Sequence, residues 1–248
     1  MRPAAVFDVA RRDLRGSLKS FIILYACLAL GVAAICAVGL LNYSVTHALD
    51  RDARILLGGD IAVDVASQAL EASELEAIVP DGAIVSKTAN TNSIAFASNE
   101  RRVPVSIKAV DELYPLLGEI LTGKGRSDSL QLASDEVLVD PTLLPRLGVN
   151  LGETITIGQA DFTVKDTVLS EPDRIGGVIG VGPRALLSTA GLERAAILLP
   201  GSLVRYYYRL ILPDGESSAA FEDRVEGQNP ERRWRVRDAE GLQPRLRA

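Results

Sequence analysis

Few residues in this chain have the type and spacing that enzyme catalysis requires. His47 is the one histidine, and the G-x-S-x-G segment that would supply a serine nucleophile is absent. The two cysteines, Cys27 and Cys36, stand nine positions apart in an apolar run. On a helix they would lie ~13 Å apart along the axis and on opposite faces, so they cannot bridge each other. The sequence predicts no catalytic residue and no disulfide.

The residue types also predict no metal site. One histidine and two cysteines supply too few nitrogen and sulfur ligands for a zinc cluster, and no EF-hand spacing is present. The acidic residues Asp50, Asp52 and Asp64 are flanked by arginines or alternate along a strand, which is typical of solvated faces. We therefore interpret them as surface charge.

One segment matches a nucleotide-binding pattern in form. Residues Gly180–Ala185 fit G-x-G-x-x-A, but a dinucleotide site also needs a complete βαβ unit and an acidic residue ~20 positions further on. We interpret the segment as a glycine turn with Pro183 at the start of a helix. The Walker A pattern G-x-x-x-x-G-K-[ST] is absent, so we expect no cofactor site and no ATP hydrolysis by this chain.

The element that organises the rest is the apolar run Phe21–Leu41, which holds no charge, amide or proline. A helix of that length rises ~31 Å, close to the ~30 Å hydrocarbon core of a bilayer. The run therefore predicts a transmembrane helix. A cleaved signal peptide is the alternative, but its apolar core is shorter, and the residues after Leu41 keep helical spacing here. We expect an uncleaved anchor.

The charges flanking this run predict its orientation. Of 27 basic and 32 acidic residues, five basic and only two acidic ones precede Phe21. Lysine and arginine beside a first span tend to stay in the cytoplasm, so residues 1–20 are expected to be a cytoplasmic amphipathic segment. The long acidic remainder is then outside the membrane, and its charge argues against nucleic acid as a partner.

Beyond the anchor, the pattern predicts a stalk helix over residues 42–59 and a mixed α+β domain over residues 60–238. Val45, Leu49 and Leu56 keep helical spacing, and Gly58-Gly59 should end the stalk. A mobile surface loop is expected from Asp111, with Gly123, Gly125 and Ser127 in it. Helices are expected at Glu71–Val79 (starting at Ser73 or a neighbour), Pro141–Leu147, Pro183 to about Thr189 and Glu216–Val225. Strands are expected at Asp60–Ala66, Ala83–Ala97, Arg102–Val110, Glu136–Val139, Thr154–Ile157, Phe162–Leu169, Ile175–Val181, Ala195–Leu199, Leu203–Leu212 and Arg232–Arg237.

Four stretches carry a resemblance to a known family. They are RRDLRGSLKS before the span, ALDRDARILLGGDIAVD after it, EVLVDPTLLPRLGVNLGETITIGQADFTVKDTVLSEPD, and LPGSLVRYYYRLIL. Together they resemble the N-terminal part of bacterial ABC-transporter permeases of the FtsX/MacB type, in the YbbP-like branch. The third stretch resembles the small β subdomain of the MacB-like periplasmic core. Residues 239–248 look like the start of a helix returning to the membrane, so we expect a truncated N-terminal fragment.

The resemblance implies a permease subunit in the bacterial inner (plasma) membrane, with its main domain in the periplasm. Its implied partners are a cytoplasmic ABC ATPase subunit, a second permease copy in a homodimer or heterodimer, and membrane lipid. ATP-driven movement would pass along the stalk by mechanotransmission, to export or extract hydrophobic compounds or lipoproteins. Two alternatives stay open: a single-span, membrane-anchored binding or scaffold protein, for example one that regulates cell-wall hydrolases, and a membrane-anchored enzyme.

Overall fold

The computed structural model describes residues 22, 24–41, 43–44, 53–173, 182–199, 201–228 and 234–238. The chain divides into two compact units, Met1–Leu49 and Asp50–Ala248. Several predictions lie outside the described residues: the amphipathic segment at 1–20, the middle of the stalk with His47, Asp50 and Asp52, the strand Ile175–Val181, and the return helix at 239–248.

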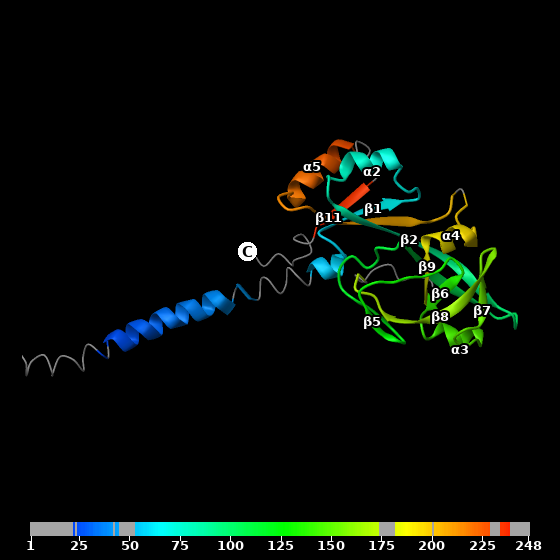
Figure 1. Ribbon diagram of the computed structural model, residues 1–248, viewed down its shortest axis with the longest axis horizontal. Helices are drawn as coiled ribbons and strands as arrows, with labels where there is room; N and C mark the ends of the chain where they lie inside the picture. Colours follow the sequence, from blue (N-terminus) through cyan, green and yellow to red (C-terminus); the bar gives the residue numbers. More distant parts are fainter. Residues whose placement is uncertain are drawn as a thin grey trace, which may run out of the picture. The chain divides into compact units, whose positions relative to one another are not determined.

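The first unit contains one long apolar helix (blue in Figure 1). Its residues Leu24–Leu41 have a mean hydropathy of 2.4, and none of them is buried. The helix is long and apolar enough to cross a bilayer, as the sequence predicted, and it holds Cys27 and Cys36 as free, exposed thiols. That this helix crosses a membrane stays a prediction.

The second unit is built on one sheet of eleven strands among its described residues. One half is an antiparallel sheet in the order β11-β1-β10-β2, with the helices α2 and α5 over one face (Figure 1). The strands are β1 (Ile61–Ala66), β2 (Ile84–Ala97), β3 (Arg102–Val110), β4 (Ile120–Thr122), β5 (Gly125–Ser127), β6 (Glu136–Val139), β7 (Thr154–Ile157), β8 (Ala160–Ser170), β9 (Arg184–Ser188), β10 (Arg205–Ile211) and β11 (Trp234–Asp238). The helices are α2 (Ala72–Ile78), α3 (Leu143–Leu147), α4 (Thr189–Ala195) and α5 (Ser218–Gln228).

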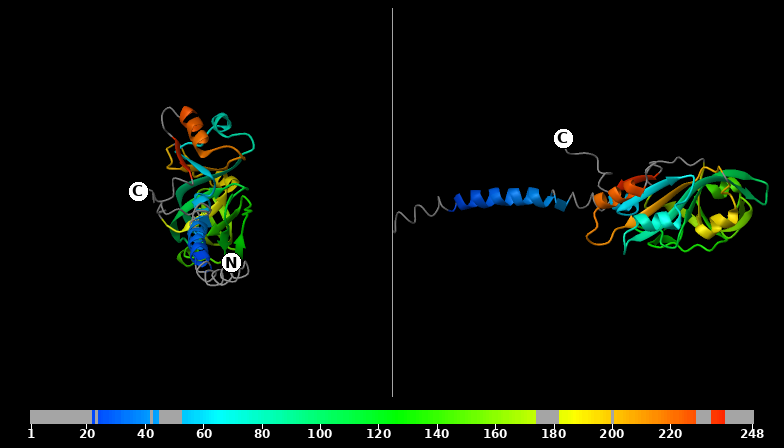
Figure 2. Two further views of the ribbon diagram at one scale, coloured as in Figure 1. Left: turned by 90° about the vertical axis from the view of Figure 1, so that its left-hand side faces the viewer. Right: turned by 90° about the horizontal axis from the view of Figure 1, so that it is seen from above.

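The other half is a closed barrel. The pairings run β2-β3-β9-β6-β8-β7 and return to β2 through Ala95–Ala97 against Ile155–Ile157. Inward-facing side chains fill it, among them Ile107, Phe162 and Leu187, each with no exposed surface. Figure 2 shows the sheet half and the green barrel strands at opposite ends of this unit. Strand β2 belongs to both halves, because its 14 residues pair first with β10 and then with β7.

The α+β class and most predicted elements are confirmed, and the glycine stop is found as expected. Residues 53–57 are helical, and Gly58 ends the helix with φ +80°. The predicted small β subdomain is larger than expected, because the long strands β2 and β3 complete its barrel. Helix α2 begins at Ala72, a neighbour of Ser73 as predicted, and the backbone N–H of its N-cap Glu71 donates to Glu74 Oε2 at 2.9 Å. Helix α3 begins at Leu143, two residues after the predicted Pro141.

Three predictions are wrong. The helix expected from Pro183 to Thr189 is strand β9, and α4 starts only at Thr189. The strand expected at Ala195–Leu199 is the end of α4 followed by an irregular stretch. Alanine and leucine favour a helix locally, but β9 lies between β3 and β6 and its Ala185, Leu186 and Leu187 are fully buried, so tertiary pairing prevails. The loop expected after Asp111 contains the hairpin β4–β5, which pairs with β8, and its Ile120 is fully buried.

Candidate functional site

A buried ionic cluster lies on the outer side of the barrel wall, where the two halves of the domain meet. Strands β3, β9 and β10 contribute Lys108, Arg184 and Arg209, and the segment after β8 contributes Glu171 and Asp173. The four side chains of Lys108, Glu171, Asp173 and Arg209 are each less than 11% exposed. Buried charges are tolerated when they are paired and hydrogen-bonded, so the pairing of each one matters.

Lys108 has a partner for each of its protons. Its Nζ donates to Tyr114 Oη at 2.8 Å, to Glu171 Oε2 at 2.7 Å and to Asp173 Oδ1 at 2.8 Å. The Tyr114 hydroxyl in turn donates to Asp173 Oδ1 at 2.7 Å. The ammonium also lies 4.3 Å from the centroid of the Tyr114 ring, which adds a cation–π contact.

Arg209 links the cluster to the point where the chain enters the domain. Its Nη2 is 2.8 Å from Asp173 Oδ2, its Nη1 donates to Thr88 Oγ1 at 2.8 Å, and its Nε donates to the Leu57 carbonyl at 3.0 Å. One planar side chain therefore joins β10, β2, the segment after β8 and the helix of residues 53–57. Arg184 completes the cluster at its edge, with Nε 2.9 Å from Glu171 Oε1.

The protonation states follow from burial and from these partners. Burial alone would raise the pKa of Asp173, but the Lys108 and Arg209 charges outweigh it and hold that pKa well below its usual range. For Glu171, burial is likewise outweighed by Lys108 and Arg184, and its pKa is lowered. The pKa of Tyr114 is raised by burial first and then by the charges of Asp173 and Glu171. The carboxylates are therefore ionised and the phenol is neutral.

The entry segment, residues 53–59, docks closely on this cluster. A Cβ added at Gly58 would lie 2.6 Å from Arg209 Cδ, and one added at Gly59 would lie 2.7 Å from the Leu210 carbonyl oxygen. A Cβ at Gly118 would lie 2.6 Å from Pro172 Cβ and 3.0 Å from Ile55 Cγ2. Only glycine permits this approach, so the segment is held against β10 and the residues after β8 by shape as well as by charge.

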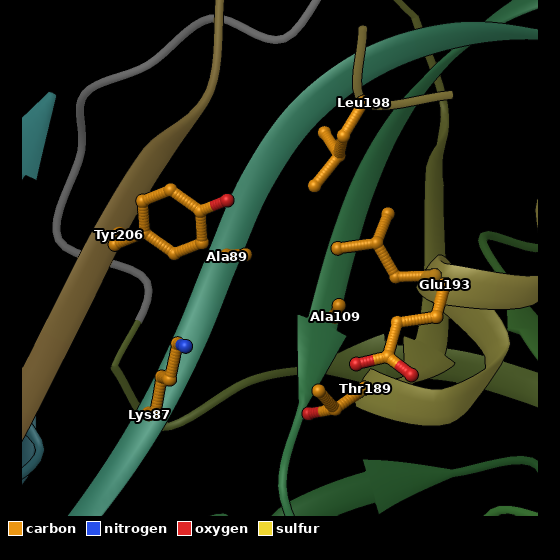
Figure 3. Close-up of a pocket in the computed structure, with 8 residues that line it drawn as sticks. Lys87, Ala89, Ala109, Thr189, Glu193, Leu198 and Tyr206 are labelled. Atoms are coloured by element: carbon orange, nitrogen blue, oxygen red, sulfur yellow. The ribbon is translucent and has the colours of Figure 1, made fainter. Parts of the chain in front are cut away.

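A small cleft lies on the opposite face of the same strands (Figure 3). It measures about 90 Å³. Lys87 and Tyr206 form one wall, Ala89 and Ala109 lie between the walls, and α4 with the residue Leu198 forms the other. Small-molecule sites usually measure ~300–1,000 Å³, so this cleft is too small for a typical ligand.

Asp64 and Gly182, which the sequence singled out, lie in the described part of the mixed domain. Asp64 lies on β1 and pairs with Arg237 at 2.6 Å. Gly182 precedes a strand and not a helix, so the strand–turn–helix context of a nucleotide fingerprint is absent from the described part of this segment. Among the described residues, no three histidine, cysteine or acidic side chains could share a metal ion.

Sequence reasoning missed the ionic cluster altogether. Lys108 and Asp173 are 65 positions apart, and neither belongs to a motif. The one available signal is that Lys108 stands between the apolar residues Ile107 and Ala109 of β3, and a lysine there is equally compatible with a solvated outer face. Each charged group of the cluster is paired with another group of the cluster, and none is left free to act as a nucleophile. The cluster therefore serves to connect segments of the fold.

Comparison with known proteins agrees with this architecture. The chain is 26% identical over 215 residues to a protein named "Uncharacterized ABC transporter permease YbbP" from Escherichia coli K12, covering 87% of this chain and 26% of that protein. It thus spans about a quarter of the length of that curated relative. The crystal structure of the periplasmic region of MacB from Actinobacillus actinomycetemcomitans has the same fold, with a TM-score of 0.51 at 14% identity over 75% of this chain and 92% of that one.

The family assignment follows from a match that spans most of the chain. The model of the MacB-like periplasmic core domain matches residues 21–228, which include both the apolar helix and the mixed domain. The match includes three of the four stretches that carried the resemblance, all but RRDLRGSLKS, and it confirms the predicted family. The chain belongs to the MacB-like periplasmic core domain family.

Proposed function

We propose that this chain is part of a permease subunit of an ABC transporter of the mechanotransmission type. The observation that carries the proposal is the family match over residues 21–228, because it joins a span-length apolar helix to a periplasmic core domain in one chain. The identity with the YbbP permease supports the same assignment. The subunit works as a dimer with a second permease copy and with a separate cytoplasmic ATPase, and it exports or extracts hydrophobic compounds or lipoproteins.

The proposed location is the bacterial inner membrane, with the N-terminus in the cytoplasm and the mixed domain in the periplasm. The basic residues before Phe21 support this orientation. ATP hydrolysis is assigned to the separate partner subunit, and residues 1–248 contain no Walker A pattern.

The entry segment supports the mechanical part of the proposal. A displacement arriving along the chain at residue 53 meets a segment that is locked to β10 and to the barrel wall through Arg209 and Asp173. Packed interiors resist compression, so such a displacement passes on to β10 and to the segment after β8 and is not absorbed within the entry segment.

The assignment is tested by recovering the natural gene product from membranes in mild detergent and identifying its partners by mass spectrometry. We expect a P-loop ATPase subunit to be recovered with it. If the protein is recovered alone, or with a periplasmic partner only, the transporter assignment is wrong and a binding or scaffold role replaces it.

The orientation is tested separately with a membrane-impermeant maleimide on intact cells whose outer membrane has been permeabilised. In a Cys27→Ser/Cys36→Ser background, a cysteine replacing the exposed Glu153 should be labelled. A cysteine replacing Ala4 should be labelled only after the inner membrane is opened. The reverse pattern would contradict the orientation.

A further inference from the structure

The ionic cluster and the cleft lie on opposite faces of the same pair of strands. On β2, Ser86 and Thr88 point to the cluster side, whereas Lys87 and Ala89 line the cleft. On β3, Lys108 is in the cluster and Ala109 lines the cleft. Alternate residues of a strand point to opposite faces, so the β2–β3 pair separates the two features.

The cleft floor is made of the smallest side chains. Ala89 and Ala109 face each other directly in the β2–β3 register. No large side chain at the floor holds the walls apart, and the floor is where the sheet half passes into the barrel. The two walls are joined in the chain by the segment between α4 and β10, where Ala196 and Gly201 have positive φ values of 50° and 88°.

Opposite charges face each other across the cleft. Lys87 stands on the wall formed by β2 and β10, and the Glu193 carboxylate turns toward it from α4 (Figure 3). The two make no ion pair within 4.0 Å in this conformation, and Lys87 lies instead 5.3 Å from the centroid of the Tyr206 ring. Bringing the walls together would therefore form a pair that the present arrangement lacks.

We propose that the domain bends about the β2–β3 pair, so that the cleft closes and Lys87 pairs with Glu193, and that the Asp173 cluster on the opposite face holds the cleft open. Bending toward the cleft lengthens the opposite face. Asp173 spans that face, because it binds Lys108 on β3 and Arg209 on β10, and the bend stretches both links. The bending does not depend on the transporter assignment; only its use in transport rests on that proposed function.

The test measures a distance across the cleft in the full-length protein in detergent, without any ATPase. Spin labels are placed by Glu76→Cys on α2 and Ala190→Cys on α4, two exposed positions on the cleft side, in the Cys27→Ser/Cys36→Ser background. Pulsed electron paramagnetic resonance should give two distances, the shorter one from the closed form. A single distance in the wild-type background overturns the proposal.

Reversing the charges of Lys87 and Glu193 tests whether these two residues pair in the closed form. Lys87→Glu should reduce the closed population roughly two- to fivefold, the range expected for a partly exposed pair, and Lys87→Glu/Glu193→Lys should restore it. If the double variant does not differ from Lys87→Glu, the pair does not form on closure. Reversal of the exposed Arg126, Arg126→Glu, is the matched control and should leave both populations unchanged.

Variants at the cleft floor and in the ionic cluster test the roles of the two faces. Ala109→Val fills the floor and should abolish the shorter distance. Tyr114→Phe removes one hydrogen bond from Asp173 and should enlarge the closed population, and Asp173→Asn should enlarge it further. Because Asp173→Asn could fail to fold, the role of the cluster is judged on the milder variant Tyr114→Phe. If the closed population of Tyr114→Phe is unchanged or smaller, the cluster does not hold the cleft open.

Discussion

Arg209 and Asp173 form an ion pair in which Nη2 and Oδ2 are 2.8 Å apart and the side chains are 10% and 1% exposed. Buried pairs contribute little net stability compared with apolar packing, yet removing one partner leaves an uncompensated charge. The pair therefore acts mainly as a connector: it fixes which segments stay together at the junction of the two halves.

Arg209→Met should destabilise the domain by about 3 kcal/mol, because Asp173 keeps Lys108 and Tyr114 but loses its second cation. Urea unfolding of the detergent-solubilised chain, followed by the fluorescence of the single tryptophan Trp234, measures the change. Arg126→Met is the matched control, since Arg126 and its partner Glu119 are 74% and 54% exposed, and it should cost less than about 1 kcal/mol. Equal unfolding midpoints for the two variants would contradict the connector role.

Stability should decrease as the pH falls below about 4.5, the ordinary pKa of a glutamate. The pKa values of Glu171 and Asp173 are lowered by folding, so the unfolded chain binds more protons than the folded one in this acidic range. Their stabilisation is complete above the ordinary pKa values and is lost as the pH drops toward the folded ones. Urea midpoints between pH 7 and pH 3 should show a shallower decrease for Glu171→Gln than for the wild type. A steeper decrease would refute this assignment.

Tyr114 should make stability sensitive to alkali. Its pKa is raised in the folded chain, so the contribution is complete below the ordinary value of 10.0 and is lost as the pH rises above it. Tyr114→Phe should cost ~1–3 kcal/mol at neutral pH, because Lys108 and Asp173 each lose a hydrogen-bond partner, and should weaken the alkaline dependence. Tyr207→Phe is the control: Tyr207 is buried too, but its hydroxyl bonds to none of the residues that the structure describes. Similar costs for both variants would show that the hydroxyl of Tyr114 has no special role.

Gly182→Ala should destabilise the domain far more than Gly125→Ala. Both glycines have positive φ, 138° and 129°, so alanine is strained at either position. A Cβ at Gly182 would also press against the backbone carbonyl of Pro104, whereas at Gly125 it would meet nothing within 4 Å. We expect about 1–2 kcal/mol for Gly125→Ala and at least twice that for Gly182→Ala by thermal or urea unfolding. Equal costs would mean that β9 shifts to make room.

The sequence predicted the elements whose pattern is decided locally. Strand β10 carries three adjacent tyrosines, and Gly58 ends a helix with φ +80°. Both signals reside in a few neighbouring residues. Strand β9 was mispredicted, since Ala185, Leu186 and Leu187 have helical propensity and only their place between β3 and β6 makes them a strand.

The candidate site was not predictable for a similar reason. Lys108 alternates with inward-facing apolar residues of β3, which places it on the outer face, where a lysine is normally solvated. It is buried only because residues 171–173 cover that face, and this contact joins positions more than sixty residues apart. No local pattern encodes such a contact.

The pairing of β1 with β10 has a consequence for synthesis of the protein. Ile61 pairs with Leu210, which is made 149 residues later. At ~5–20 residues per second, β1 waits roughly 7–30 s for this partner. During that interval an apolar strand with high β-propensity has unpaired edges and is open to pairing with other chains. The domain completes its sheet only after nearly all of its residues have been made, so its yield in the cell depends on protection of β1 before β10 emerges.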